Sequence, residues 1–161
     1  MVVDAWIEIP KGSQNKYEHD KESHVIRLDR VLHSSVHYPT DYGYIPGTLA
    51  EDGDPLDILV LISVPTFPGC VVEARVLGAL SMEDEKGEDT KILAAAVGDP
   101  RLNELRSLDD VPAHTRREIE HFFATYKDLE KKWSKVRDWK PLEAAVAEIE
   151  SARRRSESAQ A

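Results

Sequence analysis

The chain has 161 residues, which is the size of one domain and is long enough to bury a core. Its formal net charge of −9 argues against nucleic acid or an anionic membrane as the main partner, although bound divalent cations would let it accept an anionic substrate. Cys70 is the only cysteine, so no intrachain disulfide exists and a reducing compartment is expected. No leader pattern and no apolar run of ~20 residues is present, which predicts a soluble cytoplasmic protein.

In chain order, the first two-thirds of the sequence predict β-strands. Alternating or continuous apolar runs lie at residues 6–9, 25–32, 58–64, 70–80 and 91–97, and Cys70 is expected to be a buried strand residue. Residues 38–47, YPTDYGYIPG, predict an ordered loop lined by aromatic side chains. Because no long helix separates the strands, their order favours an antiparallel, barrel-like sheet over a doubly wound one.

The last third predicts two helices. Helix signals begin near residues 112–115 and continue as apolar residues at helical spacing: Ile119, Phe122, Phe123, Tyr126 and Leu129. A final helix follows Lys140, with Pro141 in its first turn and small or apolar residues to about Ala152. The polar tail, residues 153–161, is expected to be frayed. With no internal repeat or linker, residues 1–161 are predicted to form a single domain.

An acidic run at residues 51–57, EDGDPLD, carries four carboxylates just before an apolar strand. Like charges this close repel one another unless a cation neutralises them, and all-oxygen ligand sets suit hard ions such as Mg²⁺, Mn²⁺ or Ca²⁺. A calcium-binding EF-hand is excluded, because the residues at its required oxygen, glycine and glutamate positions are Leu56, Asp57 and Ser63. A second acidic run, residues 83–89, also adjoins a strand, so two such loops would face each other and share several metals. An acidic surface turn is the alternative.

Residues 52–57, DGDPLD, are the pattern by which soluble family I inorganic pyrophosphatases are identified, and other motifs agree. These are IEIP at 7–10, NKYE at 15–18, LDR at 28–30, YP at 38–39 with YGY at 42–44, Asp84 with GEDTK at 87–91, and HFF at 121–123 with YKDLE at 126–130. Ordered motifs at family-like spacings from Ile7 to about Ile149 are hard to reach by chance. The chain therefore resembles the short bacterial type of this family.

The resemblance implies a mainly β fold with α, built as an OB-like five-stranded antiparallel barrel with flanking C-terminal helices. It also implies hydrolysis of pyrophosphate to two orthophosphates by a Mg-activated water in a multi-metal carboxylate site, that is, a Mg-dependent inorganic diphosphatase. Several Mg²⁺ ions per site are expected, with Mn²⁺ or Zn²⁺ as possible substitutes. A homohexamer is the implied assembly.

By resemblance, one group of carboxylates binds the metal ions, with Asp57 bridging and Glu8 acting through water: Glu8, Asp52, Asp57, Asp84 and Asp89. Asp54 is the expected proton acceptor. Carboxylates in one cluster titrate together, so Asp89 stays an alternative for that role.

The resemblance also implies a set of cations and hydroxyl groups for the phosphate oxygens: Lys16, Arg30, Tyr42, Lys91, Tyr126 and Lys127. Lys91 is two residues from Asp89 and is expected to point into the same site from the same strand face. Tyr126 also fits the apolar helical stripe, so a core tyrosine is its alternative. Glu18 and Tyr38 are expected behind this layer, orienting Lys16 and the metal-bound waters.

The histidines at positions 19, 24, 33, 37, 114 and 121 show no metal-ligand spacing and predict surface or subunit-contact roles. The segment after Glu130 is one residue shorter than in many proteins of the resembled family and lacks their glycine. Two rival functions stay open: a non-catalytic OB-like module whose acidic loops hold metal, and a metal-dependent phosphohydrolase acting on nucleotides or other phosphate esters. The second rival would need a pocket for a base or sugar, for which the sequence offers no separate segment.

Overall fold

A computed structural model describes every residue of the chain, 1–161, as eight strands, two α-helices and two short 3-10 helices. The strands are β1 (Val2–Ile9), β2 (Asn15–Asp20), β3 (Val25–Val31), β4 (Asp41–Tyr44), β5 (Asp57–Leu61), β6 (Val71–Asp84), β7 (Gly87–Ala96) and β8 (Ser134–Lys140). The helices are η1 (Pro100–Leu102), η2 (Leu108–Asp110), α1 (Ala113–Thr125) and α2 (Leu142–Gln160).

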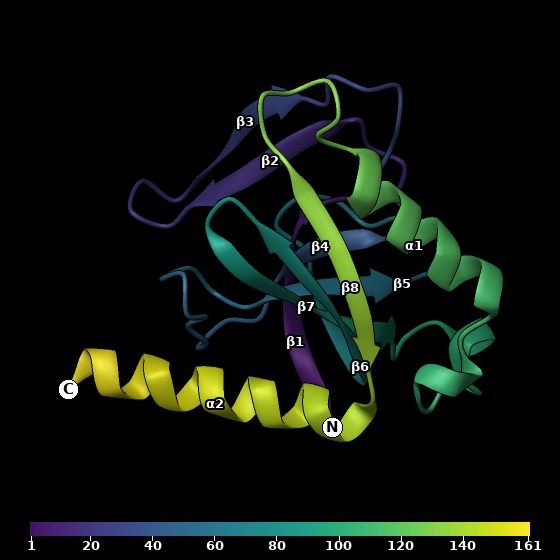
Figure 1. Cartoon of the computed structure of the whole chain (residues 1–161). Helices are drawn as coiled ribbons and strands as arrows, with labels where there is room; N and C mark the ends of the chain where they lie inside the picture. The colour runs from purple at the N-terminus through teal and green to yellow at the C-terminus, as the bar shows by residue number, and fades with distance from the viewer.

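Five strands close into a barrel in the order β1-β4-β5-β7-β6, and β6 pairs with β1 to complete the ring, while β8 extends the sheet from β6 (Figure 1). The predicted five-stranded barrel is confirmed, with one correction to its antiparallel order: β5 and β7 are parallel. The parallel pair arises because β6 runs antiparallel to β7 and returns the chain to the end of the barrel at which β5 begins.

Strand β4 corrects the prediction that residues 38–47 form a loop, because Asp41–Tyr44 pair with both β1 and β5. Its glycine explains how the short strand fits. A Cβ at Gly43 would lie 1.9 Å from the carbonyl oxygen of Trp6, so only a residue without a side chain allows this close approach of β4 to β1. Two of the aromatic residues that suggested a loop, Tyr42 and Tyr44, instead belong to this barrel strand, two positions apart.

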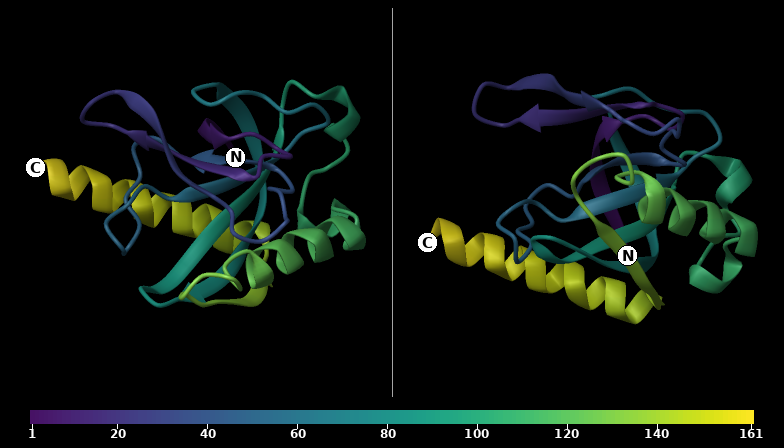
Figure 2. Two further views of the ribbon diagram at one scale, coloured as in Figure 1. Left: turned by 90° about the horizontal axis from the view of Figure 1, so that it is seen from above. Right: turned by 45° about the horizontal axis from the view of Figure 1, so that its top comes forward.

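Two further strands were not predicted from the sequence. β2 pairs only with β3, in a separate two-stranded sheet that projects beside the barrel (Figure 2). Its sequence, NKYEHD, has no apolar alternation, because the hairpin rests on the barrel with half-buried polar side chains. β8 carries charged residues at its exposed positions and follows the loop after α1.

The two predicted helices are present, with corrected ends. α1 stops at Thr125, so Tyr126 caps the helix and Leu129 lies beyond it, exposed to solvent. α2 continues to Gln160, which corrects the expected frayed tail at residues 153–161. Neither α-helix is long and apolar enough to cross a membrane.

Buried side chains form two clusters, one on each side of the barrel wall. One cluster joins barrel residues to Ala145, Ile149 and Ala152 of α2. The other joins the opposite side chains of β5, β6 and β7 to Ile119, Phe122 and Phe123 of α1. Cys70 belongs to neither cluster: it is half-buried in the turn just before β6, which corrects its prediction as a buried strand residue.

Candidate active site

A pocket of about 320 Å³ opens between the β2–β3 sheet, one end of the barrel and the loop at residues 50–56, here called the acidic loop. Its charged lining consists of seven carboxylates and four lysines. The carboxylates are Glu8, Glu18, Asp52, Asp54, Asp57, Asp84 and Asp89, and the lysines are Lys16, Lys21, Lys86 and Lys91. We call this cavity the acidic pocket. Its excess of carboxylates makes it suited to cations.

Lys91 lies at the floor of the acidic pocket, 2% exposed. Its Nζ lies 3.1 Å from Asp57 Oδ2 and 3.1 Å from Asp89 Oδ2, and it donates a 2.8 Å hydrogen bond to the Tyr42 hydroxyl. Strand register brings these three side chains together. Asp57 and Lys91 are register partners on the parallel strands β5 and β7, and Asp89 lies two residues before Lys91 on the same face.

Burial and mutual charge set the ionisation of this group. Burial raises the pKa of Asp57, and Asp89 raises it further against the opposing effect of Lys91. Burial alone would lower the pKa of Lys91, but Asp57 and Asp89 hold it well above its usual value. Burial also raises the pKa of Tyr42 well above its usual range. Lys91 therefore stays an ammonium, and Tyr42 stays a neutral phenol.

The acidic loop presents Asp52 and Asp54 at the mouth of the pocket. The Asp54 amide donates to Asp52 Oδ1 at 3.0 Å, and Gly53 between them has φ +92°, a conformation that glycine adopts without strain. Residues 51–54 are exposed. The Asp54 carboxylate accepts no hydrogen bond and forms no ion pair within the chain, so it is available to solvent and ligands.

Glu8 and Asp84 enter the pocket from two other strands. Glu8 Oε2 accepts a 2.8 Å hydrogen bond from the His19 amide, and burial raises the pKa of Glu8 to about 7, opposed by that hydrogen bond and reinforced by Asp57. Asp84 ends β6 and lies 3.7 Å from the Lys127 Nζ. Burial thus outweighs the nearby positive charges of Lys21 and Lys16 at Glu8, and a bound cation would stabilise its charged form.

The residues present fit a divalent hard cation by their chemistry. Five carboxylates predicted as ligands line one pocket, and burial makes the charge of two of them, Glu8 and Asp57, unfavourable without a counter-ion. No three histidine, cysteine, aspartate or glutamate side chains stand together closely enough to enclose an ion. Asp57 and Asp89 are instead bridged by the Lys91 ammonium.

The predicted substrate contacts divide into two groups. Lys16, Tyr42, Lys91 and Tyr126 line the acidic pocket, and burial raises the pKa of Tyr126 to about 12. Tyr126 is also packed against Phe122 and Phe123, as its alternative interpretation as a core tyrosine requires, and its contact with substrate stays a prediction. Lys16 Nζ is 2.6 Å from Glu18 Oε1, as expected if Glu18 orients it.

Arg30, Lys127 and Tyr38 do not line the pocket. The Arg30 guanidinium is held by Asp29 at 2.5 Å and by Glu130 at 3.1 Å, and Glu130 is almost fully buried in the loop after α1. Lys127 reaches the site only through Asp84. Tyr38 is buried behind Tyr42, with ring centroids 5.4 Å apart, so it supports that side chain from the core.

Several pocket residues were missed from the sequence, and His19 was predicted only to have a surface or subunit-contact role. His19 is half-buried and lines the pocket, its ring stacked 4.0 Å from Trp6 and its Nδ1 2.9 Å from the Tyr44 hydroxyl. Lys21 and Lys86 also line it. The only sequence signal for these two lysines was their position in turns next to motif residues. The other five histidines are exposed.

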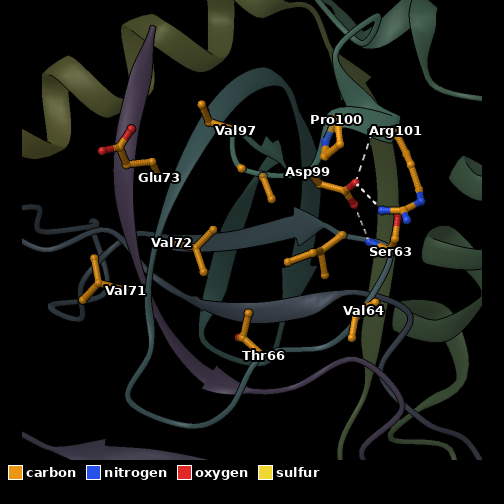
Figure 3. A pocket seen from close by; sticks show the side chains of 13 residues that line it. Ser63, Val64, Thr66, Val71, Val72, Glu73, Val97, Asp99, Pro100 and Arg101 are labelled. Atoms are coloured by element: carbon orange, nitrogen blue, oxygen red, sulfur yellow. Dashed lines mark hydrogen bonds and ion pairs between the residues drawn. The ribbon is translucent and has the colours of Figure 1, made fainter.

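A second cavity, of about 520 Å³, lies away from this site, and its apolar lining residues include Val64, Val71 and Val72 (Figure 3). Its polar feature is Asp99, whose carboxylate accepts hydrogen bonds from the Ser63 amide at 2.8 Å and from the Arg101 amide at 3.1 Å. It contains none of the predicted site residues, so the acidic pocket is the candidate active site.

Comparison with known proteins agrees with this geometry. The family model described as inorganic pyrophosphatase matches residues 5–157. The inorganic pyrophosphatase of Geobacillus stearothermophilus is 54% identical over 149 residues, 92% of this chain and 90% of that protein. The one from Halalkalibacterium halodurans is 56% identical over 149 residues, 92% of this chain and 91% of that protein.

Solved structures show the same fold. The inorganic pyrophosphatase of Thermus thermophilus superimposes with a TM-score of 0.95 at 51% identity, over 97% of this chain and 91% of that one. The enzyme of Helicobacter pylori gives a TM-score of 0.95 at 45% identity, over 97% of this chain and 94% of that one. With an OB-like barrel, an acidic pocket and these similarities, the chain belongs to the inorganic pyrophosphatase family.

Proposed function

We propose that this pyrophosphatase cleaves pyrophosphate into two orthophosphates in the acidic pocket, with divalent ions held by its carboxylates. One observation carries the proposal: Asp57 and Asp89 meet Lys91 on the floor of a pocket with three further predicted metal ligands on its walls. Residues 1–161 would act as a single catalytic domain, in the cytoplasm.

The metal ligands we propose are Glu8, Asp52, Asp57, Asp84 and Asp89. When bound, Mg²⁺ ions would lower the pKa of a water between them and neutralise the phosphate oxygens. Mg²⁺ is the proposed ion, because the donors are all carboxylate oxygens. Mn²⁺ and Zn²⁺ are proposed as substitutes, because they also bind carboxylate oxygens.

Asp54 is the better candidate for the proton acceptor. Asp89 Oδ2 lies 3.1 Å from the Lys91 Nζ, so this oxygen already has a partner in the chain. The Asp54 carboxylate has no partner in the chain and lines the same pocket at an exposed position, where it is free to accept a proton from a water. The geometry thus favours Asp54 over Asp89, which we retain as a metal ligand.

Cationic and phenolic groups would bind the two phosphates. Lys16 and Lys91 supply positive charge, and the neutral phenols of Tyr42 and Tyr126 supply O–H donors. Arg30 and Lys127 would join after substrate charge draws Arg30 from Asp29 and Lys127 from Asp84. Positioning and charge neutralisation are the protein's main contribution to phosphoryl transfer.

Phosphate release from pyrophosphate, measured with Mg²⁺ and with chelator, tests this proposal. We expect fast, Mg²⁺-dependent release from pyrophosphate and little from ATP, because the sequence offers no separate segment that would build a pocket for a base or sugar. Release from ATP at a similar rate would favour the broader phosphohydrolase. No release with any divalent ion would favour the non-catalytic metal-binding module.

A homohexamer is the assembly we propose for this chain. The proposal rests on the resemblance to the short bacterial type, and the exposed face of α1 that carries His114 and His121 is one candidate contact. Sedimentation velocity at pH 8 should give a mass near six times the chain mass of 18.1 kDa. The same measurement at pH 5 would test whether protonated histidines weaken the assembly. A monomer at both pH values would refute the proposed hexamer.

A further inference from the structure

The chain segment that leads into the acidic loop is bound to α2 through the backbone of one residue, Leu49. Its amide donates to the Ala152 carbonyl at 2.9 Å, and its carbonyl accepts a 2.8 Å hydrogen bond from Arg155 Nε. Figure 1 shows the C-terminal half of α2 below the loop between β4 and β5. Both polar groups of the Leu49 peptide backbone are therefore satisfied by residues more than one hundred positions away in the sequence.

Arg155 is itself held in place. Its Nη2 donates to Glu148 Oε1 at 2.9 Å, and Glu148 lies two turns earlier on the same face of α2. Both side chains are about one-third exposed, at 32% and 35%. Glu148 also lines a small cavity that contains Asp52, Asp57 and Asp89. Glu148 thus lies beside three of the proposed metal ligands, and Arg155 lines a neighbouring cavity with Ala50, Glu51 and Gly53 of the acidic-loop region.

The acidic loop has few other restraints. At its base, the Ile45 amide donates to the Leu56 carbonyl and the Leu56 amide donates to Thr48 Oγ1. Within it, the backbone hydrogen bonds are local turns, from Ala50 to Asp54 and from Gly53 to Ala50. Because residues 51–54 are exposed, the position of Asp52 depends on where the segment before Ala50 is fixed.

The hydrogen bond from Arg155 to the Leu49 carbonyl connects the distal part of α2 to the segment before the acidic loop. The last α2 residue in the buried core is Ala152, and among residues 153–161 only Arg155 forms a hydrogen bond to a residue outside the helix. Arg154, its neighbour, bonds only to Ser151 of the same helix. The segment whose composition suggests a frayed tail therefore carries one specific link to the active-site loop.

We propose that Arg155 is a positioning residue, which fixes the acidic loop through the Leu49 carbonyl and so sets the affinity of the site for divalent ions. The proposal rests on the proposed metal site. When a residue that holds metal ligands in place from behind is removed, the affinity of the site for metal typically falls about tenfold or more. The reason is that the ligands are no longer preordered, so binding must pay for ordering them.

The experiment compares Arg155→Ala and Arg155→Lys with wild-type protein, and uses Arg154→Ala as the matched control on the same helix. Mg²⁺ binding is measured by calorimetry without substrate, and hydrogen exchange of the metal-free proteins is measured at residues 50–54. We expect Arg155→Ala to weaken Mg²⁺ binding about tenfold. It should also speed exchange in the acidic loop, whereas Arg154→Ala changes neither.

Arg155→Lys should recover part of both effects, because an ammonium can donate to the Leu49 carbonyl but cannot also form the fork to Glu148. Equal Mg²⁺ affinity and equal loop exchange in Arg155→Ala and wild type would overturn the proposal while leaving the metal site intact. Faster exchange confined to α2, with unchanged Mg²⁺ affinity, would also overturn it, because Arg155 would then only stabilise the helix. Wild-type protein that binds no Mg²⁺ would overturn the metal assignment and this inference with it.

Discussion

Asp57 and Lys91 are direct neighbours on parallel strands, and their charged atoms are 3.1 Å apart on the floor of the acidic pocket. One cation thus satisfies two carboxylates, because Asp89 lies at the same distance on the other side of the ammonium. The Lys91 ammonium compensates part of the negative charge of Asp57 and Asp89 without a metal ion. The charge state of each of the three residues therefore depends on the other two.

Replacing Asp57 by Asn should lower the rate of pyrophosphate hydrolysis by about a thousandfold or more, because the side chain loses the charge that would hold two metal ions. The amide keeps the size of the carboxylate, so the far-UV circular dichroism spectrum should match wild type. Asp109→Asn, at an exposed position outside the site, is the control. Unchanged turnover in Asp57→Asn would contradict the metal model.

Replacing Lys91 by Met should destabilise the metal-free protein by about 3 kcal/mol, because Asp57 and Asp89, whose side chains are 29% and 22% exposed, would be left half-buried beside each other without a counter-charge. Mg²⁺ should restore part of this loss, since ions that bind only the folded state stabilise it. Urea denaturation with and without Mg²⁺ measures both effects. Lys132→Met, on an exposed loop, should change stability little. If Mg²⁺ stabilises both variants equally, the carboxylates that pair with Lys91 are not the ones that bind Mg²⁺.

Replacing Gly43 by Ala should prevent stable folding or cost more than about 3 kcal/mol, because its Cβ would overlap the Trp6 carbonyl in the β1–β4 pair. Gly98 supplies a matched control, since a Cβ there meets no atom within 4 Å. Thermal unfolding of Gly43→Ala and Gly98→Ala gives the comparison. A Gly43→Ala protein as stable as wild type would show that β4 can move away from β1.

Acid should weaken the connection between the Ser63 segment and η1. Hydrogen bonds from Ser63, joined by those from Arg101, lower the pKa of Asp99 to about 2 (Figure 3). A folded-state pKa below the unfolded value of 3.8 means that Asp99 adds stability above about pH 4, and that this contribution is lost as the pH falls toward 2.

Asp99→Asn should therefore lower the melting temperature at pH 6 and flatten its fall between pH 4 and pH 2. Differential scanning calorimetry across this range provides the measurement. Asp109→Asn again serves as control, because its carboxylate has no hydrogen-bond partner in the chain. Parallel melting curves for Asp99→Asn and wild type would show that Asp99 is not the group that titrates.

The sequence identified the chemistry of the site better than its shape. The DGDPLD run and the GEDTK motif put Asp52, Asp57 and Asp89 among the candidate ligands, and all three line one pocket. Strand β2 escaped prediction because its side chains lie half-buried against the barrel and show no alternation of polar and apolar residues. His19 was misplaced for the same reason, since its contacts with Trp6 and Tyr44 join three strands that are separate in the sequence.

By itself the sequence determined five of the eight strands, the two α-helices and the expectation of a cation beside the acidic runs, since these depend on local periodicity and on like charges close together in the chain. Only the tertiary structure decided that Lys91 lies between Asp57 and Asp89, that Arg30 is held away from the pocket by Glu130, and that Arg155 holds Leu49. Each of these contacts depends on strand register or helix docking between distant segments, and no local pattern of residues specifies that register.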